Sequence, residues 1–172
     1  MLSIKTVNAD YFQFSSDELS FRLLTSIDEA LFCQLFSDAA VMKFISEPFP
    51  DRKAHTSFHL ATSINNDELF TRLYLVVEHN NTEIGIAAIN KIERATGIVE
   101  IGRMLLPQYQ RLGLGRRLSM ALTNRLVAVN GVKIIEKYID PRNVAAITSA
   151  VNIGYKPAEN NQQLYYYVVN TA

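Results

Sequence analysis

The first third of the chain shows apolar positions at helical spacing. Apolar residues recur every three or four positions over 27–38 and again over 54–64, which predicts two amphipathic helices. Ser26 and Glu29 have the spacing of a capping box at the start of the first helix. A short apolar strand is predicted just before it, over 21–24.

The rest of the chain alternates between extended and helical patterns. Segments 70–78 and 84–89 are rich in β-forming residues and flank Asn80-Asn81, which predicts a hairpin. The remaining predicted elements are strands over 98–106, 132–139 and 164–169, and helices over 114–129, ended by Asn130-Gly131, and over 144–152. This order, β-α-α-β-β-β-α-β-α-β, predicts an α+β (mixed α/β) fold with a single central sheet flanked by helices.

The run from Leu105 to Gly115 joins a predicted strand to a predicted helix through a glycine-bearing turn. Gly113 and Gly115 allow the main chain to approach a ligand, and the following helix start adds partial positive charge, which suits a phosphate or pyrophosphate. A nucleotide P-loop is excluded because Arg116 follows Gly115. The dinucleotide fingerprint fits weakly, since Leu118 stands where a third small residue is required.

The motif Gln110-x-x-Gly113-x-Gly115, with Pro107 ahead of it, resembles the coenzyme A loop of the GNAT N-acetyltransferase superfamily. Segment 99–107 is similar to the family's fourth strand, and Asn143 with the later Gly154-Tyr155 is similar to its Asn…Gly-Phe element. The opening of the chain is similar to the branch that includes ribosomal-protein N-terminal acetyltransferases. The resemblance implies a GNAT-like acyl-CoA N-acyltransferase fold, with a mostly antiparallel mixed sheet and with acetyl-CoA or coenzyme A as cosubstrate.

The resemblance also implies roles for individual residues. The family's fourth strand carries a bulge and parts from the fifth, so a main-chain N–H of Leu105 or its neighbour Met104 would polarise the thioester carbonyl, an effect worth about 3 kcal/mol. Asn143, besides capping a helix, stands where the family contacts the pantetheine arm. Ala150 occupies the place of the tyrosine that protonates the leaving thiolate in many members, so no acid is assigned. The loop residues expected to bind the cofactor are Gln110, Arg111, Leu112, Gly113, Leu114, Gly115 and Arg116.

Glu100 is the candidate general base, because an attacking amine must be unprotonated. It lies in an otherwise apolar strand, where partial burial would raise its pKa, and its place matches the carboxylate that some family members use. An exposed position or a structural ion pair is the alternative. His55 and His59 share a helix face but lack further nearby ligands, so no metal site is predicted.

Composition narrows the classes of function. The 172-residue chain fits one domain spanning 1–172, and its 17 basic and 17 acidic residues give no net field to attract nucleic acid. Cys33 is the only cysteine, so no internal disulfide is possible, and its helical, apolar neighbours predict a buried core thiol. No apolar run is long enough to span a membrane. We therefore expect a cytoplasmic monomer or homodimer.

Together these features favour an acetyl-CoA-dependent N-acetyltransferase in which an amine attacks the thioester directly within a ternary complex. The branch resemblance makes a protein or peptide N-terminus the first candidate acceptor, and a small amine the second. Two rivals stay open: a non-catalytic coenzyme A-binding module, and a dinucleotide-binding oxidoreductase that would bind NAD and no coenzyme A.

Overall fold

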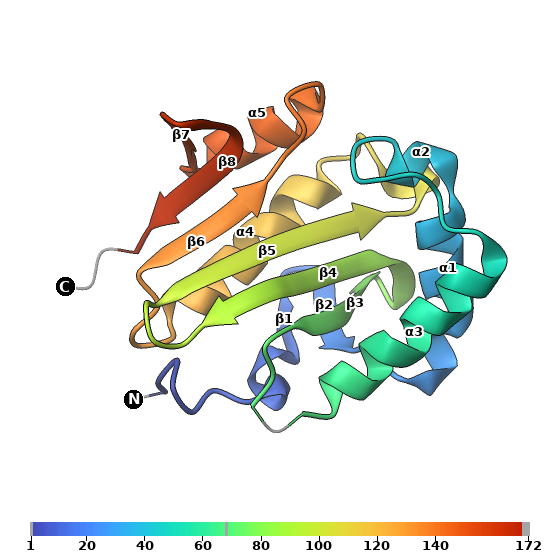
Figure 1. Ribbon diagram of the computed structural model, residues 1–172, viewed down its shortest axis with the longest axis horizontal. Coiled ribbons are helices and arrows are strands. Elements are labelled where there is room, and N and C mark those ends of the chain that lie inside the picture. Colours follow the sequence, from blue (N-terminus) through green and yellow to red (C-terminus); the bar gives the residue numbers. More distant parts are fainter. Residues whose placement is uncertain (1, 68, 170–172) are drawn as a thin grey trace.

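A single eight-stranded sheet organises the chain in the computed structural model, which describes residues 2–67 and 69–169 (Figure 1). The strand order is β1-β2-β3-β4-β5-β6-β8-β7, and all neighbours are antiparallel except β5 and β6, which are parallel. The predicted mostly antiparallel mixed sheet is therefore confirmed. The strands are β1 (Phe14–Ser16), β2 (Leu19–Leu23), β3 (Leu73–His79), β4 (Thr82–Glu93), β5 (Ile98–Leu105), β6 (Ile134–Tyr138), β7 (Lys156–Ala158) and β8 (Asn161–Val168).

Helices lie on both faces of this sheet. In the view of Figure 1, α4 and α5 lie behind the sheet, while α1 to α3 gather beside its right-hand end. The face that carries α4 and α5 is called the back face here, and the other the front face. The helices are α1 (Glu29–Ser37), α2 (Ala39–Met42), α3 (Asp51–Asn65), α4 (Leu114–Val127) and α5 (Val144–Ile153), with 3₁₀ turns at Ala9–Phe12, Ser26–Asp28 and Pro107–Tyr109.

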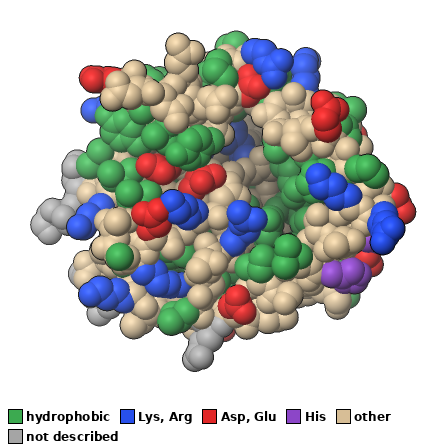
Figure 2. All heavy atoms as spheres, in the orientation of Figure 1, with side chains coloured by type: hydrophobic (Ala, Val, Ile, Leu, Met, Phe, Trp, Pro, Cys, Tyr) green, Lys and Arg blue, Asp and Glu red, His purple; other side chains and the backbone are tan. Residues whose placement is uncertain are grey.

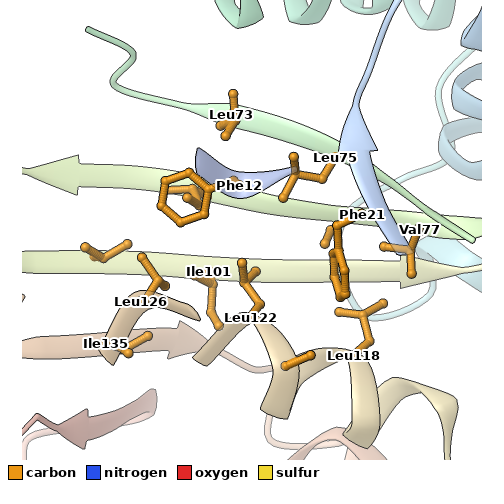
Figure 3. Close-up of a cluster of buried hydrophobic side chains, with 14 of the residues drawn as sticks. Phe12, Phe21, Leu73, Leu75, Val77, Ile101, Leu118, Leu122, Leu126 and Ile135 are labelled. Carbon is orange, nitrogen blue, oxygen red and sulfur yellow. The ribbon is translucent and has the colours of Figure 1, made fainter. Parts of the chain in front are cut away.

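Two hydrophobic clusters hold the layers together, one on each face. Because strand side chains alternate between faces, Ile101 points to the back face, where Leu118, Leu122 and Leu126 of α4 pack against the sheet (Figure 3). The front cluster joins sheet residues to α1 and α3. Its buried members are Leu24, Leu31, Phe32, Leu35, Val41, Phe58, Ala61, Val76, Ile86 and Leu106.

The long predicted elements are all present with ends shifted by a few residues, whereas β1, β7 and α2 were not predicted. Each of these three has only three or four residues, too few to show a periodic pattern. The predicted helix 114–129 ends at Val127 instead, because the Asn130 N–H and C=O pair with the N-terminal segment at Leu2 and Ile4. Gly131, at φ +92°, turns the chain after that contact.

The predicted capping box at Ser26 and Glu29 is wrong by one residue. The Asp28 carboxylate accepts the Thr25 main-chain N–H at 2.7 Å, so the pair at the helix start is Thr25 and Asp28. Asp28 is buried and also receives two hydrogen bonds from Arg22 at 2.8 and 2.9 Å. This ion pair fixes the choice of capping residue, and Glu29 is left to contact His55.

Candidate active site

β5 and β6 separate from each other part-way along their length. They pair over three residues, ending at Glu100 and Glu136. Beyond these residues, in the described part of the chain, β5 pairs with β4 alone and β6 with β8 alone, so the two strands diverge in front of the start of α4 (Figure 1). This opening, called the β5–β6 split, leaves main-chain groups on both strand edges without a strand partner.

The register of β4 and β5 decides which main-chain groups face the split. The Leu106 N–H donates to the Ile84 carbonyl at 2.9 Å, and alternate residues of an antiparallel ladder point the same way. The main-chain N–H of Met104 therefore points at β4, whereas the main-chain N–H of Leu105 points into the split. The Leu105 carbonyl accepts Nε2 of Gln110 at 2.9 Å. Of the two residues expected to supply the N–H donor, Leu105 is the one whose N–H faces the split.

The bulge expected on this strand lies on its neighbour. The register shift falls between Ile89 and Lys91 of β4, leaving Asn90 as the extra residue, while β5 keeps its register up to Leu105. Nδ2 of Asn90 donates to Oε1 of Glu100 at 3.0 Å. Gly102 leaves room for this contact, because a Cβ there would lie 3.0 Å from Asn90 Nδ2. The bulge thus orients the candidate base.

Glu100 faces the front of the sheet among other charged side chains. It is half-buried, and its register partner on β6 is Glu136. Burial raises the pKa of Glu136, with the nearby charge of Lys91 opposing the rise and those of Glu100 and Glu93 adding to it. Lys91 and Glu93 form an ion pair. Acidic and basic side chains gather on this face beside a hollow at the centre of the molecule (Figure 2).

The loop before α4 presents a row of free donors. Within the described residues, the main-chain N–H groups from Arg111 to Gly115 have no protein acceptor, while those of Arg116 and Arg117 both donate to the Gly113 carbonyl at 3.2 Å. Gly113 has φ +78°, and a Cβ there would meet no atom within 4 Å. Five consecutive N–H groups next to a helix start form a favourable site for an anion.

The side chains of this loop have separate tasks. Leu114 is buried in the core and anchors the start of α4, whereas Arg111, Leu112 and Arg116 are exposed. Arg117 donates to Glu18 at 3.1 Å. The donors that the fold holds in place in this loop are therefore its main-chain N–H groups.

Asn143 caps α5 as expected. Its Oδ1 accepts the Ala146 N–H at 3.1 Å. The helix that it starts carries the fully buried Ala150, whose methyl group can donate no proton.

With this geometry in place, residues 18–156 match the acetyltransferase (GNAT) domain family. The chain belongs to this family. A search of curated proteins finds no match.

Solved GNAT structures share the fold across distant sequences. A spermidine N-acetyltransferase from Vibrio cholerae, in complex with CoA and spermine, gives a TM-score of 0.76 at 16% identity, covering 90% of this chain and 97% of that one. A ribosomal-protein alpha-N-acetyltransferase in complex with coenzyme A gives 0.75 at 16%, covering 91% and 97%. An aminoglycoside acetyltransferase in complex with coenzyme A gives 0.72 at 17%, covering 87% and 94%. The predicted GNAT fold and the class of N-acetyltransferase are confirmed.

This GNAT chain carries a polar group behind the split that sequence reasoning missed. The guanidinium of Arg103 on β5 donates to Oγ of Ser119 at 2.6 Å and to Oγ of Ser149 at 3.3 Å. Burial lowers the pKa of Arg103 to about 10. A Cβ on Gly115 would lie 2.9 Å from Arg103 Nε. Gly115 therefore leaves the space that this arginine occupies.

Lys137 on β6 is the second buried cation. Only 4% of it is exposed, and among the described residues its Nζ has no hydrogen-bond partner. Nζ lies 4.7 Å from the ring centroid of Tyr155. Burial, followed by the nearby charge of Arg103, lowers the pKa of Lys137 well below its usual value. The sequence contains one signal for this group: in the predicted strand 132–139, Lys137 shares the face of the apolar Ile135.

In this GNAT chain, His55 and His59 on α3 and Cys33 on α1 lie away from the split, and His79 is the last residue of β3. Nδ1 of His55 lies 2.7 Å from Glu29, and among the described residues no group of three or more possible ligands could hold a metal ion. Cys33 is half-buried instead of fully buried as predicted, and burial, with Glu29 and Asp51 adding to it, raises the pKa of its thiol. Within residues 2–67 and 69–169, no helix is long and apolar enough to cross a membrane.

Proposed function

We propose that this acetyltransferase transfers the acetyl group of acetyl-CoA to a primary amine by direct attack in a ternary complex. The observation that carries the proposal is the row of free N–H groups over Arg111–Gly115 beside the β5–β6 split. Such a row fits a pyrophosphate, and the split offers free strand edges to an extended pantetheine arm. The residues present therefore fit acetyl-CoA as a substrate.

The proposal gives each part of the split one task. The main chain of the loop, held by Gln110 and Gly113, binds the pyrophosphate. Asn143 uses its Oδ1 for capping, so its side-chain amide is the part that can reach the pantetheine arm. The N–H of Leu105 donates to the thioester carbonyl and stabilises the oxyanion that forms on attack, an effect worth about 3 kcal/mol.

Glu100 acts as the general base in this proposal. Its carboxylate is half-buried at the end of the paired region and is held by Asn90. It takes the proton of the acceptor ammonium, directly or through water, so that the nitrogen lone pair can attack. No covalent enzyme intermediate is involved, and Cys33 on α1 takes no part.

The acceptor approaches from the front face, where Glu100, Glu136 and Glu93 attract a cationic amine. A protein or peptide N-terminus is our first candidate acceptor, because the hollow on this face is open to solvent (Figure 2). A small amine with several ammonium groups is the second, and it is favoured by the neighbouring carboxylates of Glu100 and Glu136, since Glu93 is paired with Lys91. The two kinds of solved relatives resemble this chain equally well, so they do not decide between these acceptors.

Separate calorimetric titrations with acetyl-CoA and with NAD test the binding of the cosubstrate. We expect saturable binding of acetyl-CoA and none of NAD. Transfer is then measured with a panel of short peptides, amino acids and spermine, by following thiol release. Binding of NAD alone, or of neither ligand, would contradict the proposal.

The variant Glu100→Gln tests the base. It keeps the shape of the side chain but cannot accept a proton, so we expect turnover to fall by about 10²-fold or more with unchanged affinity for acetyl-CoA. Glu159→Gln, in the exposed turn between β7 and β8, is the matched control and should keep full activity. Equal turnover in Glu100→Gln and wild type would remove Glu100 from the reaction.

A further inference from the structure

The back face of the β5–β6 split carries two cations that the proposed function does not use. Lys137 is the first residue of β6 after the pairing with β5 ends, and Arg103 stands on the facing edge of β5. Two residues before them, Ile135 and Ile101 belong to the core beneath α4. Side chains two apart on a strand share a face, so both cations point toward α4 and α5.

Neither cation is paired with a carboxylate in the described part of the chain. Arg103 donates to two serine hydroxyls, and Nζ of Lys137 has no acceptor although the residue is 4% exposed. Buried charges are normally paired, because an unpaired one has lost its hydration without compensation. A site that keeps two such groups together is suited to an anion.

The two faces of the split therefore carry opposite charge. Glu100 and Glu136 stand on the front, and Lys137 and Arg103 on the back. An incoming ammonium is favoured on the front, where the base lies. A negative charge that develops during the reaction is favoured on the back, close to the helix that carries Ala150 in place of a proton donor.

The acyl transfer produces such a charge, since breaking a thioester leaves a thiolate. We infer that Lys137 is a catalytic residue that stabilises and protonates the departing thiolate, while Arg103 holds positive charge beside it. This inference rests on the proposed function, because it requires coenzyme A in the split. It gives the reaction a proton donor that differs in residue type and in position from the one expected at residue 150.

The step balances in atoms and electrons. The free amine forms an N–C bond with the thioester carbonyl carbon, and the C–S bond breaks with its electron pair going to sulphur. Glu100 has already taken one proton from the ammonium, so the nitrogen gives up the extra proton left on it after attack to water. Sulphur takes a proton from the Lys137 ammonium, and the neutral lysine regains a proton from water when the thiol leaves.

The lowered pKa of Lys137 supports this role. An unperturbed lysine, with a pKa near 10.4, is a weaker acid than a thiol near 8.5, so protonating the thiolate would be uphill. Burial and the charge of Arg103 reduce that difference. The other titratable groups packed here are Tyr155, which follows α5, and Tyr165, the register partner of Lys137 on β8.

The ionisation of bound coenzyme A tests the inference without an acceptor. The thiolate of bound coenzyme A is followed by its ultraviolet absorbance as pH is raised, in wild type, in Lys137→Met and in the control Lys133→Met, whose lysine is exposed. In wild type and the control the bound thiol should titrate about one pH unit or more below the free thiol. In Lys137→Met this shift should be lost.

Equal thiol titration in wild type and Lys137→Met, with coenzyme A bound in both, would overturn the inference and leave the proposed function standing. No binding of coenzyme A to the wild type would overturn both. Should Lys137→Met fail to fold, Lys137→Gln gives the same comparison with a side chain of similar length.

Turnover supplies a second readout. With an accepted amine, we expect kcat of Lys137→Met to fall by about 10²-fold while KM for acetyl-CoA changes less than about twofold. The drop should be smallest with acetyl thioesters of more acidic thiols, which leave without help. A loss of kcat that is the same for every leaving thiol would contradict the role of Lys137 as proton donor.

Discussion

Replacing Lys137 by methionine should make the protein more stable. Its Nζ is buried without a partner, and an unsatisfied buried polar group costs about 1–3 kcal/mol. Methionine fills a similar volume, keeps the contact with Tyr155 and removes that cost. For a protein of this length a gain of about 2 kcal/mol corresponds to a rise in Tm of roughly 4–8 °C.

The pH dependence of this gain has a defined sign. The pKa of Lys137 is lower in the folded protein than in the unfolded chain, so the folded state binds fewer protons and stability rises with pH between the two values. Lys137→Met should lose that rise. Its advantage over wild type should therefore be largest below the folded-state pKa and should shrink as pH approaches the usual lysine value.

Thermal unfolding of wild type, Lys137→Met and Lys133→Met at several pH values measures both effects. Lys133 is exposed, so its substitution should change stability by less than about 0.5 kcal/mol. A Lys137→Met protein that is less stable than wild type, or that keeps the same slope of stability with pH, would refute the reasoning. It would mean that the lysine ammonium is satisfied in the folded protein.

Three further changes test other parts of the structure. Gly113→Ala strains the left-handed backbone at this position by about 1–2 kcal/mol. The free loop relieves this strain by changing conformation, and coenzyme A must restore it, so calorimetry should show binding weakened about tenfold. Asp28→Asn breaks a buried pair with Arg22, and urea unfolding should show a loss of about 3 kcal/mol. Burial would raise the pKa of Asp28, but hydrogen bonds from Arg22 and Thr25 lower it below its usual value. The stability that the ion pair contributes is therefore present above the usual pKa of an aspartate and is lost as pH falls through the lower pKa of the folded state. Glu29→Gln removes the hydrogen bond that raises the pKa of His55, so NMR titration should show the pKa of His55 falling toward about 6.5. In wild type, the stability that this bond contributes is fully present below about pH 6.5 and is lost as pH rises through the raised pKa of His55.

The long elements could be predicted because their signal is spread over many residues. The stripe from Leu114 to Leu126 has the period of a helix, and 98–106 reads as an apolar strand. Gln110, Gly113 and Gly115 marked the loop by their spacing. Short elements such as β1 and α2 gave no periodic signal, because β1 forms by pairing with β2 and α2 is a single turn capped by Asp38.

The capping pair and the bulge depended on partners distant in sequence. Asp28 is selected over Glu29 because Arg22 and Glu78 form an ion-pair network at the helix start. Asn90 becomes the bulged residue because Gly102 on the neighbouring strand leaves space for its side chain. No local pattern contains these contacts, so sequence reading placed the bulge on the strand that the family resemblance pointed to.

The charge separation across the β5–β6 split follows from strand alternation once the register is known. Parallel pairing aligns Glu100 with Glu136 on the front face, and a shift of one residue along β6 reverses the face and gives Lys137. On β5, Arg103 is three residues after Glu100, and this odd number also places its side chain on the back face. In the mechanism we propose, a sheet that splits at this point offers the Glu100 carboxylate to the attacking amine on one face and the Lys137 ammonium to the leaving sulphur on the other. Inserting one residue into β6 before Glu136 would move Glu136 to the back face and Lys137 to the front face. The charge separation therefore depends on the register of the β5–β6 pairing that ends at Glu136.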